Sequence, residues 1–94
     1  MVKNLCEEAE NQIAEILMEC RGNTCPNLFK QRNVNLFSLD MGFSAVDMLY
    51  VYMKLEDMYG ISMKDIDWSN DEVYTFDGIY KLVKQTLNEG RNSN

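Results

Sequence analysis

The side chains that could perform chemistry in this chain are few and scattered. The sequence has no histidine, the commonest general base and a frequent metal ligand. It also has no glycine-rich loop of the kind that cradles phosphates and no motif of paired catalytic acids. Its three cysteines, Cys6, Cys20 and Cys25, lack the Cys-x-x-Cys spacing and the histidine partners of a zinc site. We therefore expect a protein that is not an enzyme and holds no metal, with cysteines that are small apolar fillers or reduced surface thiols.

One short stretch imitates a calcium-binding loop. Asp65, Asp67 and Ser69 alternate as the first ligands of an EF-hand loop do. That loop also requires glycine at its sixth position and glutamate at its twelfth, where this sequence has Asn70 and Phe76. Calcium binding is therefore not predicted.

The charge of the chain is negative and unevenly distributed. Fifteen acids oppose nine bases, which gives a formal net charge of −6. Nine of the acids stand between Asp40 and Asp77, where the only bases are Lys54 and Lys64. Such a field disfavours nucleic acid and an anionic membrane as partners and favours a basic patch on another protein. With no membrane-length apolar stretch and no apolar signal region at the N-terminus, the expected location is cytoplasmic.

The length and composition predict a single domain over residues 1–94. A hydrophobic share of 46% is ample for a packed core in a chain of this size. Residues 21–43 are expected to form a long first loop that is pinned to the core by apolar residues such as Leu28 and Leu36. This segment is therefore interpreted as part of the domain and not as a free linker.

Hydrophobic residues three or four positions apart predict a first helix from Leu5 to Cys20 and a second helix that begins after Ser44. The Ser44 hydroxyl can accept from backbone N–H groups, and Asp47 three residues later completes an arrangement like a capping box. Gly60 predicts a left-handed C-terminal cap. The residues expected to form one buried stripe of the second helix are Val46, Leu49, Tyr52, Leu55 or Glu56, and Tyr59.

The remainder of the chain predicts one short and one long helix. Room for the short helix lies around Asp65 to Trp68. Thr75 is interpreted as the N-cap of a last helix that ends before Gly90, followed by a frayed tail over residues 90–94. Because no alternating strand pattern occurs, the predicted fold class is all-α.

Two motifs give the chain a resemblance to the acyl carrier protein family. Leu36-Phe37 followed by Asp40-Met41-Gly42 is similar to the Phe…Asp-Leu-Gly approach to the family's second helix. Residues 55–61, Leu-Glu-Asp-Met-Tyr-Gly-Ile, resemble the Leu-Glu-Glu-x-Phe-Gly-Ile that ends that helix. Both motifs agree in register without a gap. The resemblance covers residues 35 to 87 and implies a four-helix bundle with three long helices and one short one. The implied relatives are small acyl-carrier-related proteins of peptide-maturation systems, such as those for modified bacteriocins.

In the matched register, this chain lacks the residue to which the family attaches its prosthetic group. Carrier proteins attach 4′-phosphopantetheine to the serine of an Asp-Ser-Leu triplet, which maps here onto Ser44-Ala45-Val46. Ala45 has no hydroxyl and cannot form the phosphodiester, so no cofactor is expected. Ser44 takes the position of the family's aspartate, where a helix cap is sufficient to explain it. The alternative is a one-residue slip that makes Ser44 the attachment site of a working acyl or aminoacyl carrier.

The resemblance also implies an acidic docking face on the second helix, which partner enzymes of the family recognise through basic patches. The matching acids are Asp40, Asp47, Glu56 and Asp57, and we expect Met48 and Met53 to add apolar contact. The expected function is a non-catalytic docking protein that presents this face to a peptide-modifying enzyme. A carrier with 4′-phosphopantetheine on Ser44 is the alternative, and an acidic inhibitor or immunity-type protein is a third.

Overall fold

The computed structural model describes residues 5–20, 28–39 and 41–92, and all its regular elements are helical. The elements in chain order are α1 (Leu5–Cys20), α2 (Ala45–Tyr59), the 3-10 turns η1 (Met63–Asp65) and η2 (Asp71–Tyr74), and α3 (Phe76–Asn92). No strand occurs in these ranges, which confirms the all-α class for the described chain. Within the same ranges, no helix combines the length and the apolarity that crossing a membrane requires.

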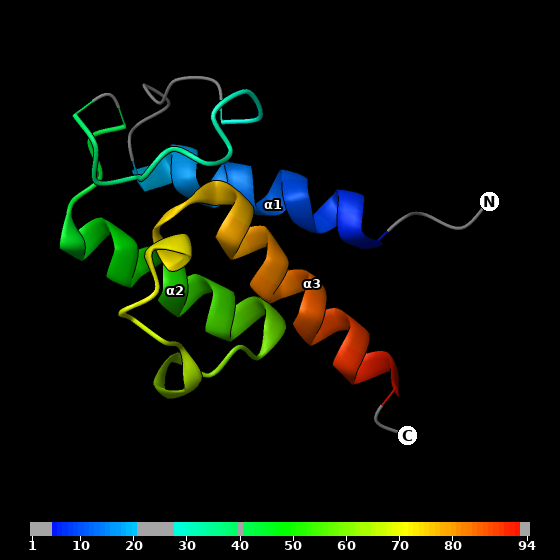
Figure 1. Ribbon diagram of the computed structural model, residues 1–94. Helices are drawn as coiled ribbons and strands as arrows, with labels where there is room; N and C mark the ends of the chain where they lie inside the picture. Colours follow the sequence, from blue (N-terminus) through cyan, green and yellow to red (C-terminus); the bar gives the residue numbers. More distant parts are fainter. Residues whose placement is uncertain (1–4, 21–27, 40, 93–94) are drawn as a thin grey trace.

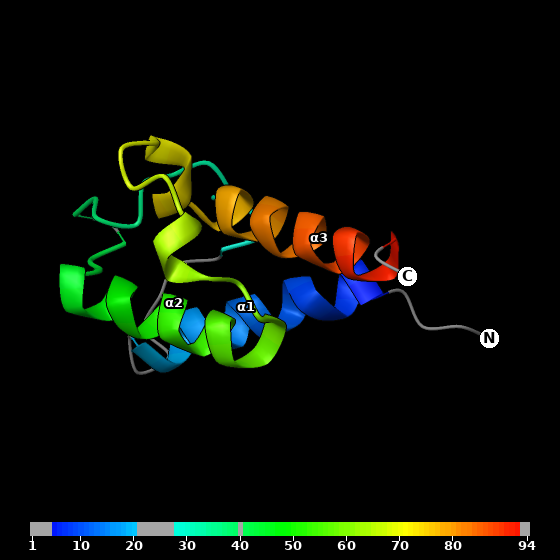
Figure 2. The same cartoon turned by 90° about the horizontal axis from the view of Figure 1, so that it is seen from below.

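The three α helices contact one another around a common core. α1 packs against α2 and α3, and α2 also contacts α3 directly (Figure 1). Seen from below, α2 runs along one side of the molecule, while the segment with η1 and η2 connects its end to the start of α3 (Figure 2). The residues buried in the core include Ile13 and Leu17 of α1, Val51 and Leu55 of α2, and Phe76, Ile79 and Val83 of α3.

The helix boundaries follow the predicted caps at most positions. Ser44 and Asp47 form a capping box at the start of α2, and Gly60 ends that helix in the left-handed conformation, with φ 76°. The Thr75 hydroxyl accepts from the Gly78 N–H at 3.0 Å, as expected of an N-cap. The predicted stop before Gly90 is wrong, because α3 continues to Asn92. Glycine inside a helix costs only about 1 kcal/mol relative to alanine. The packing of the preceding turns of α3 can offset this cost, so the helix continues beyond Gly90.

The predicted buried stripe of α2 is partly wrong. Tyr52 and Leu55 are buried as expected, but Val46 and Leu49 are exposed, and their inward positions are taken by Met48 and Val51. The cause is that α2 is apolar around most of its circumference, so two different faces fit the spacing of a buried stripe. Contact with α1 and α3 selected one of them.

The segment between α2 and α3 forms two 3-10 turns in place of the one short helix expected around Asp65 to Trp68. Side chains there bond to the neighbouring backbone: the carboxylate of Asp67 accepts from the Ser69 N–H at 3.1 Å, and the amide oxygen of Asn70 accepts from the Glu72 N–H at 3.0 Å. Such local bonds compete with a continuous helix. η2 then packs so closely on α3 that a Cβ at Gly78 would lie 1.8 Å from the Glu72 carbonyl oxygen. Only glycine fits there.

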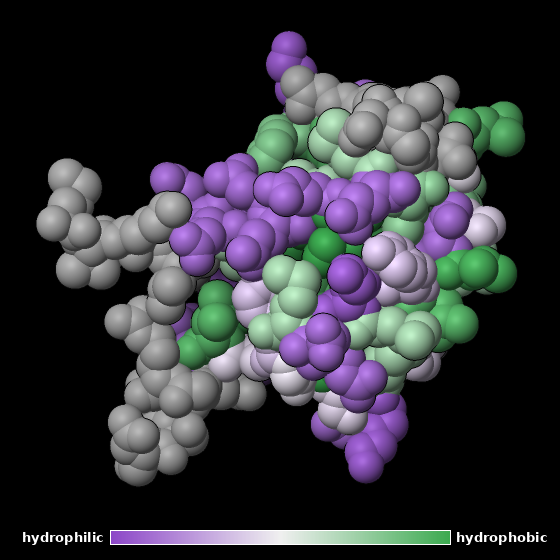
Figure 3. Space-filling model, turned by 180° about the vertical axis from the view of Figure 1, so that it is seen from behind, coloured by the Kyte–Doolittle hydropathy of each residue, from purple (hydrophilic) through white to green (hydrophobic). Residues whose placement is uncertain are grey.

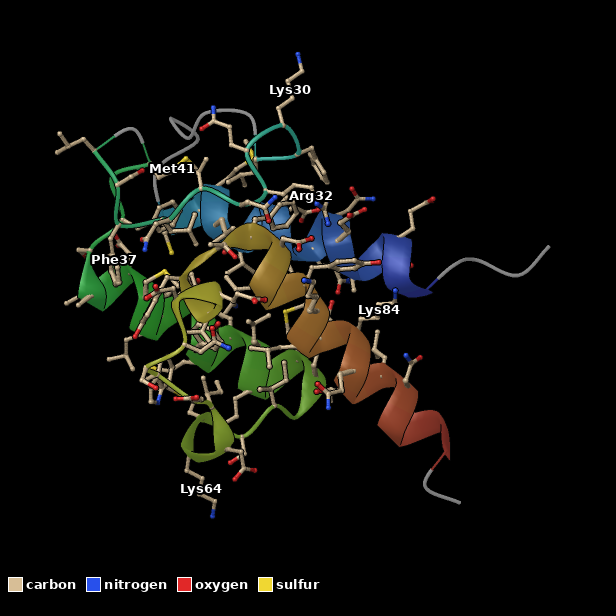
Figure 4. All side chains as sticks on the ribbon, in the orientation of Figure 1. Lys30, Arg32, Phe37, Met41, Lys64 and Lys84 are labelled. Carbon is tan, nitrogen blue, oxygen red and sulfur yellow. The ribbon has the colours of Figure 1, made fainter. Side chains whose placement is uncertain are left out.

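The described part of the first loop is held against the helices, as predicted. Leu28 and Leu36 are buried, and the Leu36 N–H donates to the Tyr74 carbonyl at 2.7 Å. The Arg32 side chain lies between α1 and the start of α3 (Figure 4). It pairs with Glu10 at 2.5 Å and with Asp77 at 3.4 Å. Arg32 thus joins three separate segments of the chain. The predictions for residues 21–27, including Cys25, lie outside the described residues.

Candidate docking surface

The first turn of α2 contains the positions on which the carrier question depends. The Asp47 N–H donates to Ser44 Oγ at 3.1 Å, and the Ser44 N–H donates to Asp47 Oδ2 at 3.0 Å. The predicted cap therefore exists, and the Ser44 hydroxyl oxygen is occupied as an acceptor. Ala45 is exposed as the first helical residue and presents a methyl group, which has no nucleophilic chemistry.

The outer face of α2 carries exposed apolar side chains at helical spacing, which we call the outer stripe. Its members, with the exposed fraction of each, are Val46 (74%), Leu49 (51%), Tyr50 (41%) and Met53 (55%). Residues at this spacing lie on one side of a helix. Figure 3 shows hydrophobic surface gathered at the edge of the molecule where α2 begins in Figure 1. α2 is therefore apolar both toward the core and away from it.

Acidic side chains follow the outer stripe at its C-terminal end. Glu56 and Asp57 are both exposed, and Asp57 stands one turn after Met53. Together with Tyr50, Met53 and Lys54 they line a shallow depression of about 560 Å³. The Lys54 ammonium lies 5.9 Å from the centre of the Tyr50 ring. This surface can accept apolar and cationic groups side by side.

The structure keeps some of the predicted docking residues on the surface and removes others. Met53, Glu56 and Asp57 are exposed, whereas Met48 is only 3% exposed and is not part of the outer stripe. Asp47 is half-buried and engaged in the cap of α2. Asp40 lies outside the described residues.

Sequence reasoning missed Val46, Leu49 and Tyr50 as surface residues. The first two fit the predicted buried stripe because they share its spacing with Tyr52. A signal was present, since Met48, Val51, Tyr52 and Leu55 form a second apolar series of the same helix. A helix with two such series cannot bury both against the same neighbours.

An open apolar cavity of about 260 Å³ lies beside the first two turns of α2, which we call the α2 cavity. The seven residues that line it are Phe37, Ala45, Met48, Leu49, Met63, Trp68 and Tyr74. They come from the first loop, α2 and the segment with η1 and η2. Leu49 and Ala45 belong both to the wall of the cavity and to the exposed side of α2.

Hydrogen bonds and ring contacts hold the walls of the α2 cavity in place. The buried Tyr52 hydroxyl donates to the Val73 carbonyl at 2.6 Å, and the ring centres of Tyr52 and Trp68 lie 5.1 Å apart with the rings nearly perpendicular. The Tyr74 hydroxyl donates to the Trp68 carbonyl at 2.7 Å, and its ring lies 5.0 Å from Phe37. Burial raises the pKa of Tyr52 above its ordinary value of 10.0, because the phenolate would lose its hydration.

The acidic motif around Asp67 is an internal turn. The Asp67 carboxylate accepts from the N–H and the hydroxyl of Ser69, at 3.1 Å and 2.5 Å. These bonds lower the pKa of the carboxyl group, because they stabilise its charged form. Among the described residues, no group of three or more histidine, cysteine, aspartate or glutamate side chains is arranged to hold a metal ion.

No protein-family model, curated protein or solved structure matches this chain. The resemblance to acyl carrier proteins accordingly rests on the motifs of the sequence itself.

Proposed function

We propose that this chain is a non-catalytic, acyl-carrier-related docking protein that presents α2 to a basic patch of a peptide-modifying enzyme. The observation that carries the proposal is the outer stripe, which leaves Val46, Leu49, Tyr50 and Met53 exposed and ends one helical turn before the exposed acids Glu56 and Asp57. Contiguous apolar surface rimmed by polar residues marks interaction sites in folded proteins. In this proposal the segment with η1 and η2 takes the place of the family's short helix.

The charge of this half of the molecule supports a basic partner. Among the residues from 41 to 77, Lys54 and Lys64 are the only bases. Lys64 points away from the body of the molecule (Figure 4). Complementary charge raises the rate of association and excludes acidic partners.

A working carrier with 4′-phosphopantetheine on Ser44 is the second candidate. The observation in its favour is the α2 cavity, which adjoins Ala45 and could shelter an apolar group attached nearby. Against it stands the cap, which turns the Ser44 oxygen toward the Asp47 N–H. Transfer to Ser44 would compete with this cap for the same oxygen.

The two candidates are separated by the intact mass of the protein after coexpression with a broad-specificity phosphopantetheinyl transferase. We expect no phosphopantetheine on the wild type and, if the surrounding surface is recognised, modification of Ala45→Ser. The control is Ser44→Ala combined with Ala45→Ser, in which only the new hydroxyl is available. Detection of the phosphopantetheine mass increment on wild-type Ser44 would contradict the docking proposal and support the carrier function.

The docking surface can be tested in the producing cell with a photo-crosslinking amino acid at position 53. Position 18 is the matched control, because Met18 is also an exposed methionine but belongs to α1. We expect the position-53 probe to capture an enzyme with a basic surface and the position-18 probe not to. Capture that survives Glu56→Lys with Asp57→Lys, at the same yield, would contradict docking through the acidic face.

A further inference from the structure

We propose that the α2 cavity receives one apolar side chain, leucine or phenylalanine, from a basic amphipathic helix of the partner. This inference rests on the proposed function and adds to it the feature that fixes the partner's position along α2. Charge attracts a partner over a broad area, whereas a single side chain in a pocket selects one register.

The chemistry of the α2 cavity suits an uncharged apolar group. None of the described residues that line it is charged, and the Tyr74 hydroxyl already donates to the Trp68 carbonyl. An engineered apolar cavity of about 150 Å³ admits benzene, so about 260 Å³ leaves room for a leucyl or phenyl side chain. Phe37 and Trp68 are 42% and 40% exposed, so aromatic surface is already accessible at the mouth.

The position of the cavity relative to the acids points to a helix as the occupant. Leu49 lines the cavity, and Glu56 and Asp57 follow seven and eight residues later in the same helix. At 1.5 Å per residue the acids stand about 11 Å farther along the axis. A partner helix carries side chains at the same spacing, so an apolar anchor and a basic pair two turns away would meet their complements together.

Charge also argues against two other occupants. A second copy of this chain packed along α2 would bring its own Glu56 and Asp57 to a surface of the same sign. A fatty acid would add a carboxylate to a half of the chain that has nine acids between residues 40 and 77. A basic amphipathic helix instead offers an apolar side chain for the cavity and positive charge that complements the acids.

The experiment uses three short helical peptides without tryptophan or tyrosine. The first combines a leucine anchor with lysines, the second has alanine in place of leucine, and the third has glutamates in place of the lysines. Trp68 is the only tryptophan and lines the cavity, so its fluorescence reports directly on the site. We expect the leucine–lysine peptide to shift the emission to shorter wavelength and to bind about tenfold more tightly than the alanine–lysine peptide.

A cavity-filling variant separates insertion from general adhesion. Ala45→Leu places a larger side chain at the mouth, and we expect it to remove the difference between the leucine and alanine peptides. Asn11→Leu, on the exposed side of α1, is the control for an added surface leucine and should retain the difference. Circular dichroism verifies that both variants stay folded.

The outcomes distinguish this inference from the proposed function. Equal binding of the leucine–lysine and alanine–lysine peptides would overturn insertion and leave acidic docking in place. Equal binding of the glutamate peptide, or no binding of any peptide, would overturn basic docking itself. A Trp68 emission shift that depends on protein concentration alone would assign the cavity to a second copy of the chain and overturn the inference. A shift caused by decanoate, a simple fatty acid, and not by the peptides would assign the cavity to a fatty acyl ligand and also overturn it.

Discussion

The two faces of α2 have similar composition and opposite surroundings. Val51, Tyr52 and Leu55 are completely buried on the inner face, whereas Leu49 on the outer face keeps 51% of its surface in solvent. Both faces are apolar and both follow the spacing of an amphipathic helix. The difference teaches that an apolar series shows which side chains favour burial and does not show which neighbour will bury them.

The largest expected difference between the two faces is in stability, when one leucine of each face is replaced by alanine. Leu55→Ala should lower the free energy of unfolding by about 2–5 kcal/mol, because it leaves a cavity in the core. Leu49→Ala should cost about 0.5 kcal/mol or less, because its side chain is half in solvent already. Chemical denaturation of both variants measures the difference. Equal losses would mean that the outer face is buried in the free protein.

A smaller effect is expected from the tyrosines of the two faces. Tyr52→Phe removes the donor to the Val73 carbonyl and leaves that oxygen buried without its bond, at a cost of about 1–3 kcal/mol. Tyr50→Phe removes only an exposed contact with Glu19 at 3.3 Å and should change stability by about 0.5 kcal/mol or less. Denaturant midpoints compare the two. A larger loss for Tyr50→Phe would reverse the assignment of the faces.

Alkaline pH should also lower the stability of the fold, through Tyr52 on the inner face. Burial raises the folded-state pKa of Tyr52 above 10.0, so the protonated phenol stabilises the fold. This contribution is fully present below the unfolded pKa near 10 and decreases as the pH rises above it. We expect the stability of the wild type to fall between pH 9 and pH 11, and to fall less in Tyr52→Phe. An identical decline in both proteins would place the titrating group elsewhere.

The smallest effect on stability is expected from the acids of the outer face. Reversal of Glu56 and Asp57 to lysine should change the unfolding free energy by about 0.5 kcal/mol or less, since both are exposed. The same reversal should weaken binding of a basic partner, and wild-type binding should weaken as salt rises. Glu7→Lys with Glu15→Lys on α1 makes the same change in net charge and is the matched control. Equal weakening by both pairs would indicate net charge and not the α2 surface.

Local chemistry made much of this structure predictable. The Ser44–Asp47 box, the left-handed Gly60 and the Thr75 cap each involve residues within four positions of one another, so their types and spacing are sufficient. The helical class of the described chain follows from the same short-range periodicity. The absence of a hydroxyl at position 45 is likewise a property of the sequence alone.

Tertiary structure decided what depends on distant segments. Whether Met48 or Leu49 faces the core was settled by the positions of α1 and α3, because both residues fit an apolar helical series. The role of Arg32 required Glu10 and Asp77 to meet from opposite ends of the chain. The α2 cavity likewise exists only where the first loop, α2 and the segment before α3 come together, since spacing within one helix carries no information about what packs beside it.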